Sequence, residues 1–525
     1  MDSLHVSLAG VSSLSDLVLT QGSDGVTLTL ANGGATLATL LHTTASDLVL
    51  GVTLFIAEPE GRNPGALGSP TSPAPIRSVT AMHYLGQDFL DDNGQDGTTV
   101  GGLSGLTYDP ASGDYYALSE DGGTVDAARF YRFSLDLSDG SLADGDGAIA
   151  AVTLLSDLEG VLLPTGSLNP KAMALTDNGS VYIASEQDGN GIPWIREFSL
   201  SGQQLAELAL PAAFLDDGSG QTGVRPNLAL ESLALSPTGQ FLYTATEEAL
   251  IQDGDRASTE TGSAVRLVQY DLTGATPTTV AQFVYVTDAI PAAATATTAD
   301  SNGLVELLAL SDQGLLLALE RSVTANGVGA KVYQVQLDGA TDVSAVFSLV
   351  GFSGTTATKT LVLDLATLGI DLETLEGMTL GQPLANGNPT LILVSNDYFD
   401  AGVAQNNQIL AFELEINRDP VFESASRVFS VSENSHQGTA RSPTVTATDP
   451  DGTTGLIYSL SAGNLDPDSD GNPAFAVNAS SGALTVNDPD DLDFETSPSY
   501  GLTLTVTDPG GLTARPRHGA DHGCQ

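Results

Sequence analysis

The chain has 525 residues, and 17 Lys and Arg against 65 Asp and Glu give a formal net charge of -48. This balance excludes nucleic acid as a partner, because binding it requires Lys and Arg to displace counterions from the phosphates. No run of about 18 apolar residues is present, so the sequence predicts no membrane-spanning helix. Such a surface attracts cations, and Ca²⁺ in particular prefers carboxylate and carbonyl oxygens.

The single cysteine, Cys524, excludes an intrachain disulfide. The first residues, MDSLHVSLAGVSS, lack the basic and continuous apolar segments of a signal peptide. We therefore expect either an export signal that is not visible in this sequence or a start inside a longer open reading frame.

Short runs rich in Val, Leu, Thr and Tyr alternate with turns containing Gly or Pro, which indicates an all-β protein. Residues 1–62 contain strand-like runs at 25–30 and 48–56 and predict a small β-rich region, a sandwich or its remnant. A linker rich in Pro, Gly and Ser follows at 63–75. The best candidate for a short helix is 360–376.

Residues 76–415 repeat a pattern of two apolar strands that are joined by a turn and end in a polar doublet. The copies are LSGLTYDPASGDYYALSED (103–121), PKAMALTDNGSVYIASEQ (170–187), LESLALSPTGQFLYTATEE (230–248), VELLALSDQGLLLALER (305–321) and LEGMTLGQPLANGNPTLILVSND (375–397). They begin roughly 60 to 75 residues apart, which suits a four-stranded β-propeller blade with its loops. Five copies are visible, and the length of the region predicts about six blades.

The ends of these hairpins carry a repeated set of acidic side chains. The start of the first strand and the end of the second lie at the same end of an antiparallel hairpin. We therefore expect these acids to converge on one mouth of the propeller channel, where cations must compensate their charge. The alternative is that they are hairpin-end residues facing water. The set is Glu231, Glu306, Glu376, Glu120, Asp121, Glu186, Glu247, Glu248, Glu320, Asn396 and Asp397, and nearby cations are Lys171, Arg225, Arg266 and Arg321.

Three stretches resemble the phytase-like family described as having esterase-like activity. They are GGLSGLTYDP…YYALSEDGG…ARFYRFSLDL (101–137), SVYIASEQDGNGIPWIREFSLSGQ (180–203) and GVRPNLALESLALSPTGQFLYTATEEALIQDG (223–254). The resemblance implies a secreted β-propeller that hydrolyses phosphoric or carboxylic esters. It places recurrent family residues at Arg129, Glu186, Arg225, Asn227, Glu231, Glu247 and Arg266. Lys171 stands where the family usually has Glu, which either breaks an acidic site or completes a salt bridge.

Ester hydrolysis at the predicted mouth could be assisted by Ca²⁺, which would neutralise a phosphate and activate a water. We expect Glu186, Glu231 and Glu247 to act as ligands or base, and Arg225 and Arg266 to clamp the phosphate. No G-x-S-x-G motif is present, which argues against a serine esterase of the α/β-hydrolase kind. None of the six His lies in the repeated motifs, which argues against a His-based phosphatase or a zinc site.

Residues 416–514 resemble a cadherin repeat of bacterial surface proteins, through NRDPVFESASRVFSVSEN (417–434), TATDPDGTTGLIYSL (446–460) and LTVNDPDDLDFETSPSYGLTLTVTD (484–508). The resemblance implies a β-sandwich whose oxygen ligands bind Ca²⁺ at domain junctions. The matching ligands toward the propeller are Asn417, Asp419, Asp449, Asp451 and Asp508. Those toward a further cadherin-like domain of a longer parent protein are Glu433, Asp493 and Glu495. The alternative for Asp449-Pro-Asp-Gly is a simple turn.

The last residues, 515–525 (RPRHGADHGCQ), break the alternating pattern. We expect an irregular tail and a sandwich that lacks its last strand, with an exposed edge.

Two functions are open at this point. The first is an extracellular or cell-surface hydrolase of small-molecule or polymeric esters, with Ca²⁺ as its cofactor. The second is a non-catalytic, Ca²⁺-dependent binding or adhesion protein whose propeller recognises an extracellular or surface ligand. Clustered carboxylates suit both, whereas a compact pocket of Glu and Arg with a bound cation distinguishes the enzyme.

Overall fold

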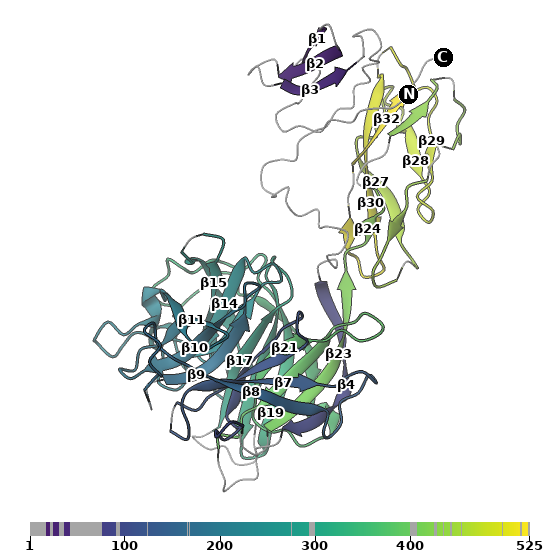
Figure 1. Cartoon of the computed structure of the whole chain (residues 1–525). Helices are drawn as coiled ribbons and strands as arrows, with labels where there is room; N and C mark the ends of the chain where they lie inside the picture. Colours follow the sequence, from purple (N-terminus) through teal and green to yellow (C-terminus); the bar gives the residue numbers. More distant parts are fainter. Residues whose placement is uncertain are drawn as a thin grey trace. The chain divides into compact units, whose positions relative to one another are not determined.

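The computed structural model describes residues 17–21, 25–30, 36–41, 76–90, 95–399, 407–514 and 517–522, apart from short gaps at 123, 165, 167, 275, 293–299, 425–427, 434, 441–443, 453 and 496. The chain divides into two compact units, Pro75–Asn417 and Met1–Ala74 with Arg418–Gln525. The described elements are β-strands and short 3-10 helices, which confirms the all-β class (Figure 1). In this part of the chain, no helix has the length and apolar character needed to cross a bilayer.

The unit Pro75–Asn417 contains five four-stranded sheets. The first three are β5 (Leu103–Tyr108), β6 (Tyr115–Ser119), β7 (Arg129–Leu135) and β8 (Gly147–Leu154); β9 (Leu168–Leu175), β10 (Ser180–Asp188), β11 (Trp194–Ser199) and β12 (Gln204–Leu208); and β13 (Leu230–Leu235), β14 (Phe241–Thr246), β15 (Ala264–Asp271) and β16 (Thr278–Val286). The fourth is β17 (Ser301–Ala309), β18 (Leu315–Thr324), β19 (Gly327–Gln336) and β20 (Thr358–Asp364). The fifth is β21 (Leu375–Gly381), β22 (Thr390–Ser395), β23 (Asn407–Arg418) and β4 (Ile76–Leu90).

The first strands of these sheets form a closed ring. Strand β5 contacts β9, β9 contacts β13, β13 contacts β17, β17 contacts β21, and β21 returns to β5. The sheets are therefore the blades of a β-propeller (Figure 1). The described residues give five blades, not the six expected from length. The N-terminal strand β4 completes the fifth blade beside β23 and adds no blade of its own, while long loops take up the remaining residues.

Each junction between neighbouring blades has its own hydrophobic cluster. The inner strands β5, β6 and β22 are buried along almost their whole length, because they lie between blades and contribute apolar side chains on both faces. The five clusters are represented by the pairs Phe130 and Ile183, Ala172 and Leu233, Tyr243 and Leu316, Leu317 and Leu391, and Leu103 and Ile409.

The prediction of a helix at 360–376 is wrong. Strand β20 runs to Asp364, whose carboxylate accepts a hydrogen bond from Ala366 N at 3.0 Å and caps a single 3-10 turn, Leu365–Leu368. Gly369 ends the turn in the left-handed region at φ 68°, and β21 begins at Leu375. Pairing of β20 with β19 on the outside of the blade overrides the local helix propensity.

The second unit contains the predicted C-terminal sandwich. Its main sheet has the order β25 (Val428–Val431), β32 (Arg517–His522), β30 (Ser499–Thr507), β27 (Ile457–Ala462), with β31 (Thr513–Ala514) beside β30. Two small sheets are β24 (Val421–Phe422) with β26 (Ala447–Thr448), and β28 (Phe475–Val477) with β29 (Leu484–Val486). Phe429, Phe475, Tyr500 and Leu504 are among the core residues.

The expectation of an irregular tail at 515–525 is corrected by β32. Residues 517–522 pair antiparallel with β30 and parallel with β25, so the sheet has its closing strand. Ladder hydrogen bonds use only backbone groups, so the strand forms although its composition carries no apolar alternation. The same unit includes an antiparallel sheet of β1 (Leu17–Gln21), β2 (Gly25–Leu30) and β3 (Thr36–Leu41). The run expected at 48–56 and the linker at 63–75 lie outside the described residues.

Candidate functional site

The first strand of each blade carries a β-bulge near its start. In β9 the pairing with β10 passes from Pro170 to Ala172, so Lys171 has no partner in the ladder. Glu231 in β13 and Glu376 in β21 are bypassed in the same way. A bulge bends the strand and re-aims the extra side chain. The bulges therefore set the direction of three charged side chains.

These three side chains belong to a buried group that we call the central cluster. All five blades contribute to it, and none of its side chains is more than 14% exposed. Lys171 Nζ lies 2.6 Å from Glu120 Oε1, 3.4 Å from Glu231 Oε1 and 4.0 Å from Glu186 Oε2. The cluster consists of Glu120, Lys171, Glu186, Glu231, Glu247, Arg321 and Glu376.

Arg321 is the second cation of the cluster. Its Nη2 lies 3.3 Å from Glu247 Oε1, and its Nη1 donates to Glu376 Oε1 and to the hydroxyl of Tyr398. Asn396 Nδ2 donates to Glu376 Oε2 at 2.9 Å and also to Glu120 Oε2. Asn396 thus connects the Arg321 side of the cluster to the Lys171 side.

The predicted convergence of hairpin-end acids is therefore observed for Glu120, Glu186, Glu231, Glu247 and Glu376. Of the two expected consequences of Lys171, the structure shows the completed salt bridge. Tyr398 was not anticipated. It is 45% exposed, has a positive φ of 51° and donates its hydroxyl to Glu376 Oε1 at 2.7 Å. A non-glycine residue in this region is strained by roughly 1–3 kcal/mol, and such strain is frequent at functional sites.

Five carboxylates face two cations, so their protonation states differ. Burial and the negative charge of Glu376 raise the pKa of Glu120 to about 8, against the opposing effect of Lys171. Burial also raises the pKa of Glu231 and of Glu247. Although burial acts in the same direction on Glu376, the charge of Arg321 lowers its pKa to about 2. The cluster therefore contains one carboxyl group with a lowered pKa and three with raised pKa values, and carboxyl groups whose pKa values are pushed apart are the usual arrangement for acid–base work.

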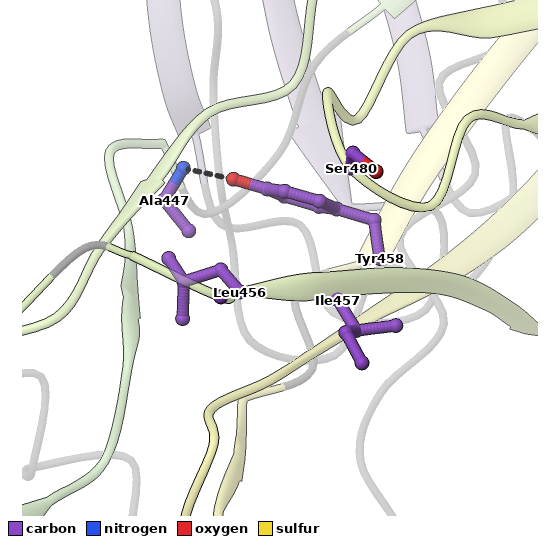
Figure 2. Close-up of a pocket in the computed structure, with 6 residues that line it drawn as sticks. Ala447, Leu456, Ile457, Tyr458 and Ser480 are labelled. Carbon is purple, nitrogen blue, oxygen red and sulfur yellow. Dashed lines mark hydrogen bonds between the residues drawn. The ribbon is translucent and has the colours of Figure 1, made fainter.

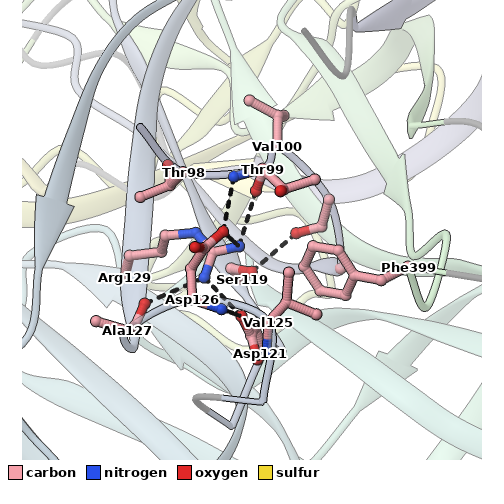
Figure 3. Close-up of polar contacts among 12 residues, drawn as sticks. Thr98, Thr99, Val100, Ser119, Asp121, Val125, Asp126, Ala127, Arg129 and Phe399 are labelled. Carbon is pink, nitrogen blue, oxygen red and sulfur yellow. Dashed lines mark hydrogen bonds and ion pairs between the residues drawn. The ribbon is translucent and has the colours of Figure 1, made fainter. Parts of the chain in front are cut away.

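Arg129 contacts Asp121, the residue that follows Glu120 in the chain (Figure 3). Its Nη1 lies 2.8 Å from Asp121 Oδ2, and its Nη2 donates to Thr99 O at 2.8 Å. The backbone N of Glu120 in turn donates to Gly102 O at 2.6 Å, so the segment after β6 is joined to the segment before β5. The face of Phe399 lies 5.6 Å from the Arg129 guanidinium carbon. Arg129 is thus a positioning residue for the cluster.

Three of the expected mouth acids bind elsewhere. The Asp121 carboxylate accepts from Arg129, as described, and Glu248 accepts from Arg256 Nε and from Ala257 N. Glu320 accepts from Tyr285, Asn302 and Lys359. These carboxylates have local structural partners, so the convergence is selective.

The position of the β-bulge in β17 determines that Glu306 does not join the central cluster. In β17 the bypassed residue is Val305, one position before Glu306, so Glu306 lies in the ladder. Its Oε1 accepts from Leu233 N at 3.2 Å and from Leu307 N at 2.9 Å, and burial raises its pKa well above the ordinary value. A one-residue shift thus moves this Glu out of register with Glu231.

The two arginines expected to clamp a phosphate are engaged by protein groups. Arg266 is fully buried; its Nε and Nη2 contact Asp253 at 2.6 and 2.9 Å, and its Nη1 faces Gln282 and the Val343 carbonyl. Arg225 donates to Ala249 O and Gly254 O. We therefore do not retain the clamp role for Arg266, because its guanidinium cannot reach a ligand. The cations brought to the carboxylates are Lys171 and Arg321 instead.

The central cluster does not fit Ca²⁺. The Lys171 ammonium occupies the space among Glu120, Glu186 and Glu231 that a cation would fill. Among the described residues, the only group of three acidic ligand atoms close enough together to hold one ion is Asp466, Asp468 and Asp470, outside the propeller. No step of the chemistry at the cluster is therefore assigned to Ca²⁺.

The expected Ca²⁺ ligands of the C-terminal unit are partly brought together. Asp451 N donates to Asp449 Oδ1 at 2.9 Å, and burial followed by the charges of Asp451 and Asp508 raises the pKa of Asp449. Asp508 is 3% exposed, and its Oδ2 has no hydrogen-bond partner among the described residues. These buried oxygens fit Ca²⁺. Asp451 Oδ1 also lies 2.8 Å from Arg418 Nη1, an ion pair that the ion would have to displace.

The second expected ligand group consists of Glu433, Asp493 and Glu495, and its residues lie close to one another. Phe494 N approaches Glu433 Oε2 at 3.4 Å, and Glu495 N donates to Asp493 Oδ1 at 3.0 Å. Asp419 is half-buried beside Arg418 in the chain, and Asn417 is the last residue of the propeller unit. The structure thus groups Glu433 with the 493–495 turn.

A pocket of about 490 Å³ lies in the C-terminal unit (Figure 2). Its walls are Ala447, Leu456, Ile457, Tyr458 and Ser480 together with Gly455, and Ala447 N donates to the Tyr458 hydroxyl at 3.0 Å. The lining offers apolar surface and hydroxyl groups but no carboxylate, amine or imidazole. We assign no acid–base chemistry to it.

Comparison with protein families gives two matches. Residues 98–399, more than half of the chain, match the family described as "Phytase-like: Esterase-like activity of phytase", and residues 427–518 match the cadherin domain. No curated protein is significantly similar to the chain.

Several solved structures are similar to parts of the chain. The third cadherin domain of human protocadherin 7 is 23% identical over 20% of this chain and 87% of its own, with a TM-score of 0.18. The human desmocollin-1 ectodomain is 25% identical over 26% of each chain, with a TM-score of 0.17. The GH62 α-L-arabinofuranosidase catalytic domain of Coprinopsis cinerea is 9% identical over 65% of this chain and 99% of its own, with a TM-score of 0.35. At these TM-scores the likenesses carry no argument about function.

Proposed function

Because this chain belongs to the phytase-like family described as having esterase-like activity, we propose that it is an extracellular hydrolase of phosphoric or carboxylic esters. The active site of the proposal is the central cluster. The observation that supports it is the convergence of Glu120, Glu231 and three further carboxylates with Lys171 and Arg321 from five blades. Family membership alone does not establish chemistry, so the residues of this site have to support it.

The proposed roles follow from protonation state and exposure. Glu120 has the most exposed side chain of the cluster, at 14%, and its raised pKa keeps a proton available near neutral pH. Glu120 would protonate the leaving oxygen of the ester. Glu231 also has a raised pKa, so once ionised it is a stronger base than an ordinary Glu and would take a proton from the attacking water. Water thus supplies the new oxygen, and the alcohol leaves neutral.

Lys171 and Arg321 would stabilise negative charge that develops on the ester during attack. Both lie in a nearly dry site, where their charge acts more strongly than in water. Among the described residues, two cations contact the carboxylates of the cluster, Lys171 and Arg321, so the site suits an ester with one phosphate or carboxyl group better than a highly phosphorylated substrate. Tyr398 contacts Arg321 and is 45% exposed, so it would be an accessible group beside the cluster.

Turnover by the full chain tests this proposal. Phosphomonoesters, phosphodiesters and carboxylic esters are offered with Ca²⁺ and with chelator, and Glu231→Gln is compared with Glu207→Gln. Glu207 pairs with Arg196 and is 52% exposed, so its variant controls for the lost charge. We expect Glu231→Gln to lower kcat about 10²–10⁴-fold, the usual effect of a lost general base. Equal turnover by the two variants would overturn the assignment.

A second candidate is a non-catalytic, Ca²⁺-dependent binding or adhesion protein. It is favoured by the cadherin match and by the unpartnered Asp508 Oδ2 beside Asp449. In this case no ester is hydrolysed, and Ca²⁺ still raises the unfolding temperature of the C-terminal unit. If ester turnover persists in the presence of chelator and is lost only in variants of the central cluster, a non-catalytic binding or adhesion role is excluded as the whole function.

A further inference from the structure

The loop between β27 and β28 (Figure 1) contains three aspartates, Asp466, Asp468 and Asp470. Carboxylate oxygens of Asp466, Asp468 and Asp470 lie within 4.8 Å of one another. The spacing D-x-D-x-D-G, with Gly471 at a positive φ of 94°, matches the first half of a Ca²⁺-binding loop, in which alternate residues supply oxygens and glycine makes the sharp turn. The twelfth position of such a loop is Val477 here, where a bidentate Glu would be required. The loop therefore lacks its strongest ligand within its own sequence.

A fourth carboxylate comes from another segment. Asp491 lies between β29 and β30, is 1% exposed, and approaches Asp468 N with its Oδ1 at 3.4 Å. Its Oδ2 is buried and has no hydrogen-bond partner among the described residues. A buried, unpartnered carboxylate oxygen is costly unless a ligand satisfies it. Asp491 thus faces the loop with a free oxygen and is independent evidence for a ligand there.

The charge around Asp491 favours a cation. The carboxylates of Asp468, Asp466 and Asp488 are its charged neighbours. In the described part of the chain, no Lys, Arg or His forms an ion pair with any of these aspartates. Gathered carboxylates of this kind repel one another unless a cation lies between them.

The base of the loop is held in place without the ion. Asn464 Nδ2 donates to Phe475 O at 2.7 Å, and Phe475 N donates back to Asn464 Oδ1 at 3.0 Å. Asn487 Nδ2 donates to Pro473 O at 2.8 Å, which ties the loop to the segment that leads to Asp491. The two ends of the loop are therefore anchored beside the segment of Asp491 before a metal binds.

We propose that Asp466, Asp468, Asp470 and Asp491 form a Ca²⁺ site inside the C-terminal unit. It shares no residue with the ligand groups around Asp449 and Glu433, so it stabilises the sandwich itself and not a junction between domains. Hard oxygen ligands and an exposed entrance suit Ca²⁺, which exchanges its waters readily. Binding would connect the 466–470 loop to the 487–491 segment and stiffen that end of the sandwich.

Calcium binding to the full chain tests the proposal by two measurements. Equilibrium dialysis with Ca²⁺ counts the bound ions, and hydrogen exchange follows the backbone of 464–475. The variants are Asp491→Asn and the double variant Asp468→Asn with Asp470→Asn, whose side chains are exposed and whose loss does not endanger folding. Asp490→Asn, an exposed neighbour outside the site, is the matched control.

We expect both site variants to bind one Ca²⁺ fewer than wild type and to lose the Ca²⁺-dependent slowing of exchange at 464–475. The control keeps both. Asp491→Asn should also raise the unfolding temperature of the metal-free unit, because it removes a buried charge. Unchanged stoichiometry in both site variants, or no protection of 464–475 by Ca²⁺ in wild type, would overturn the proposal. Neither measurement depends on ester turnover, so the Ca²⁺ site and the proposed ester hydrolysis are tested independently of each other.

Discussion

Lys171→Met removes the cation that holds one side of the central cluster together. Its side chain is 6% exposed and lies within 4.0 Å of Glu120, Glu186 and Glu231. Although burial lowers the pKa of Lys171, the charges of Glu120 and Glu231 raise it well above the ordinary value, so the ammonium stays charged throughout the stable range. Met fills a similar volume without charge, so the substitution isolates the electrostatic contribution.

The expected magnitude follows from the loss of one partner in a buried ion pair, which costs about 3–5 kcal/mol when the remaining charge cannot be relieved. Here it can be relieved by protonation. A carboxyl whose folded-state pKa is raised binds more protons in the native state, so stability falls as pH rises from its unfolded value toward its folded value. Without Lys171 the pKa values of Glu120 and Glu231 rise further. The loss should therefore be largest near pH 8 and much smaller near pH 5.

Denaturant unfolding followed by Trp194 fluorescence measures this loss. Trp194 is the only Trp of the chain, lies in β11 and is 2% exposed, so it reports on the propeller unit. The control is Lys331→Met, because Lys331 pairs with Asp288 at 2.9 Å with both side chains about a third exposed. Such a pair contributes less than about 1 kcal/mol. A Lys171→Met loss as small as the control, or equal at the two pH values, would refute the reasoning.

Three further predictions concern stability. Arg266→Met should cost the propeller about 3–5 kcal/mol by leaving Asp253 buried and unpaired, with ester turnover of the folded fraction unchanged; lost turnover at native stability would contradict this. The wild-type denaturation midpoint should fall as pH rises from about 4.5 to 8, because the pKa of Glu120 is raised to about 8 in the folded protein. The stabilisation from Glu376, whose pKa is lowered to about 2, is lost only as pH falls below about 4.5. A midpoint that rises between pH 5 and 8 would argue against this. Truncation after Ala514 should remove β32, expose the edges of β25 and β30 and make the C-terminal unit sensitive to protease while Trp194 unfolding is unchanged; an unchanged digestion pattern would contradict it.

The convergence of the hairpin acids was predictable because chain direction in an antiparallel hairpin fixes which ends meet. Glu186, Glu231 and Glu247 were therefore expected at one mouth. In the structure, Glu186 and Glu231 lie beside Lys171, and Glu247 lies beside Arg321. The sequence pattern also indicated the C-terminal sandwich, because its alternating runs and ligand spacing are strong local signals.

The remaining features depend on long-range geometry. The register of β17 bypasses Val305 and not Glu306, and no property of the VELLAL run reveals this shift. Arg266 is enclosed by Asp253 and by carbonyls about 80 positions later in the chain, so its role could not be inferred from spacing. The blade count depended on β4, whose partner β23 follows more than 300 residues later.

We propose above that the central cluster hydrolyses esters with Glu120 as the acid. The most direct test is the pH dependence of kcat/KM for the best ester of the panel, compared between wild type and Glu120→Gln. We expect wild-type activity to fall above pH about 8, as Glu120 loses its proton, and Glu120→Gln to be about 10²–10⁴-fold slower and to lack this decline. A Glu120→Gln protein with wild-type activity and an unchanged pH profile would contradict it.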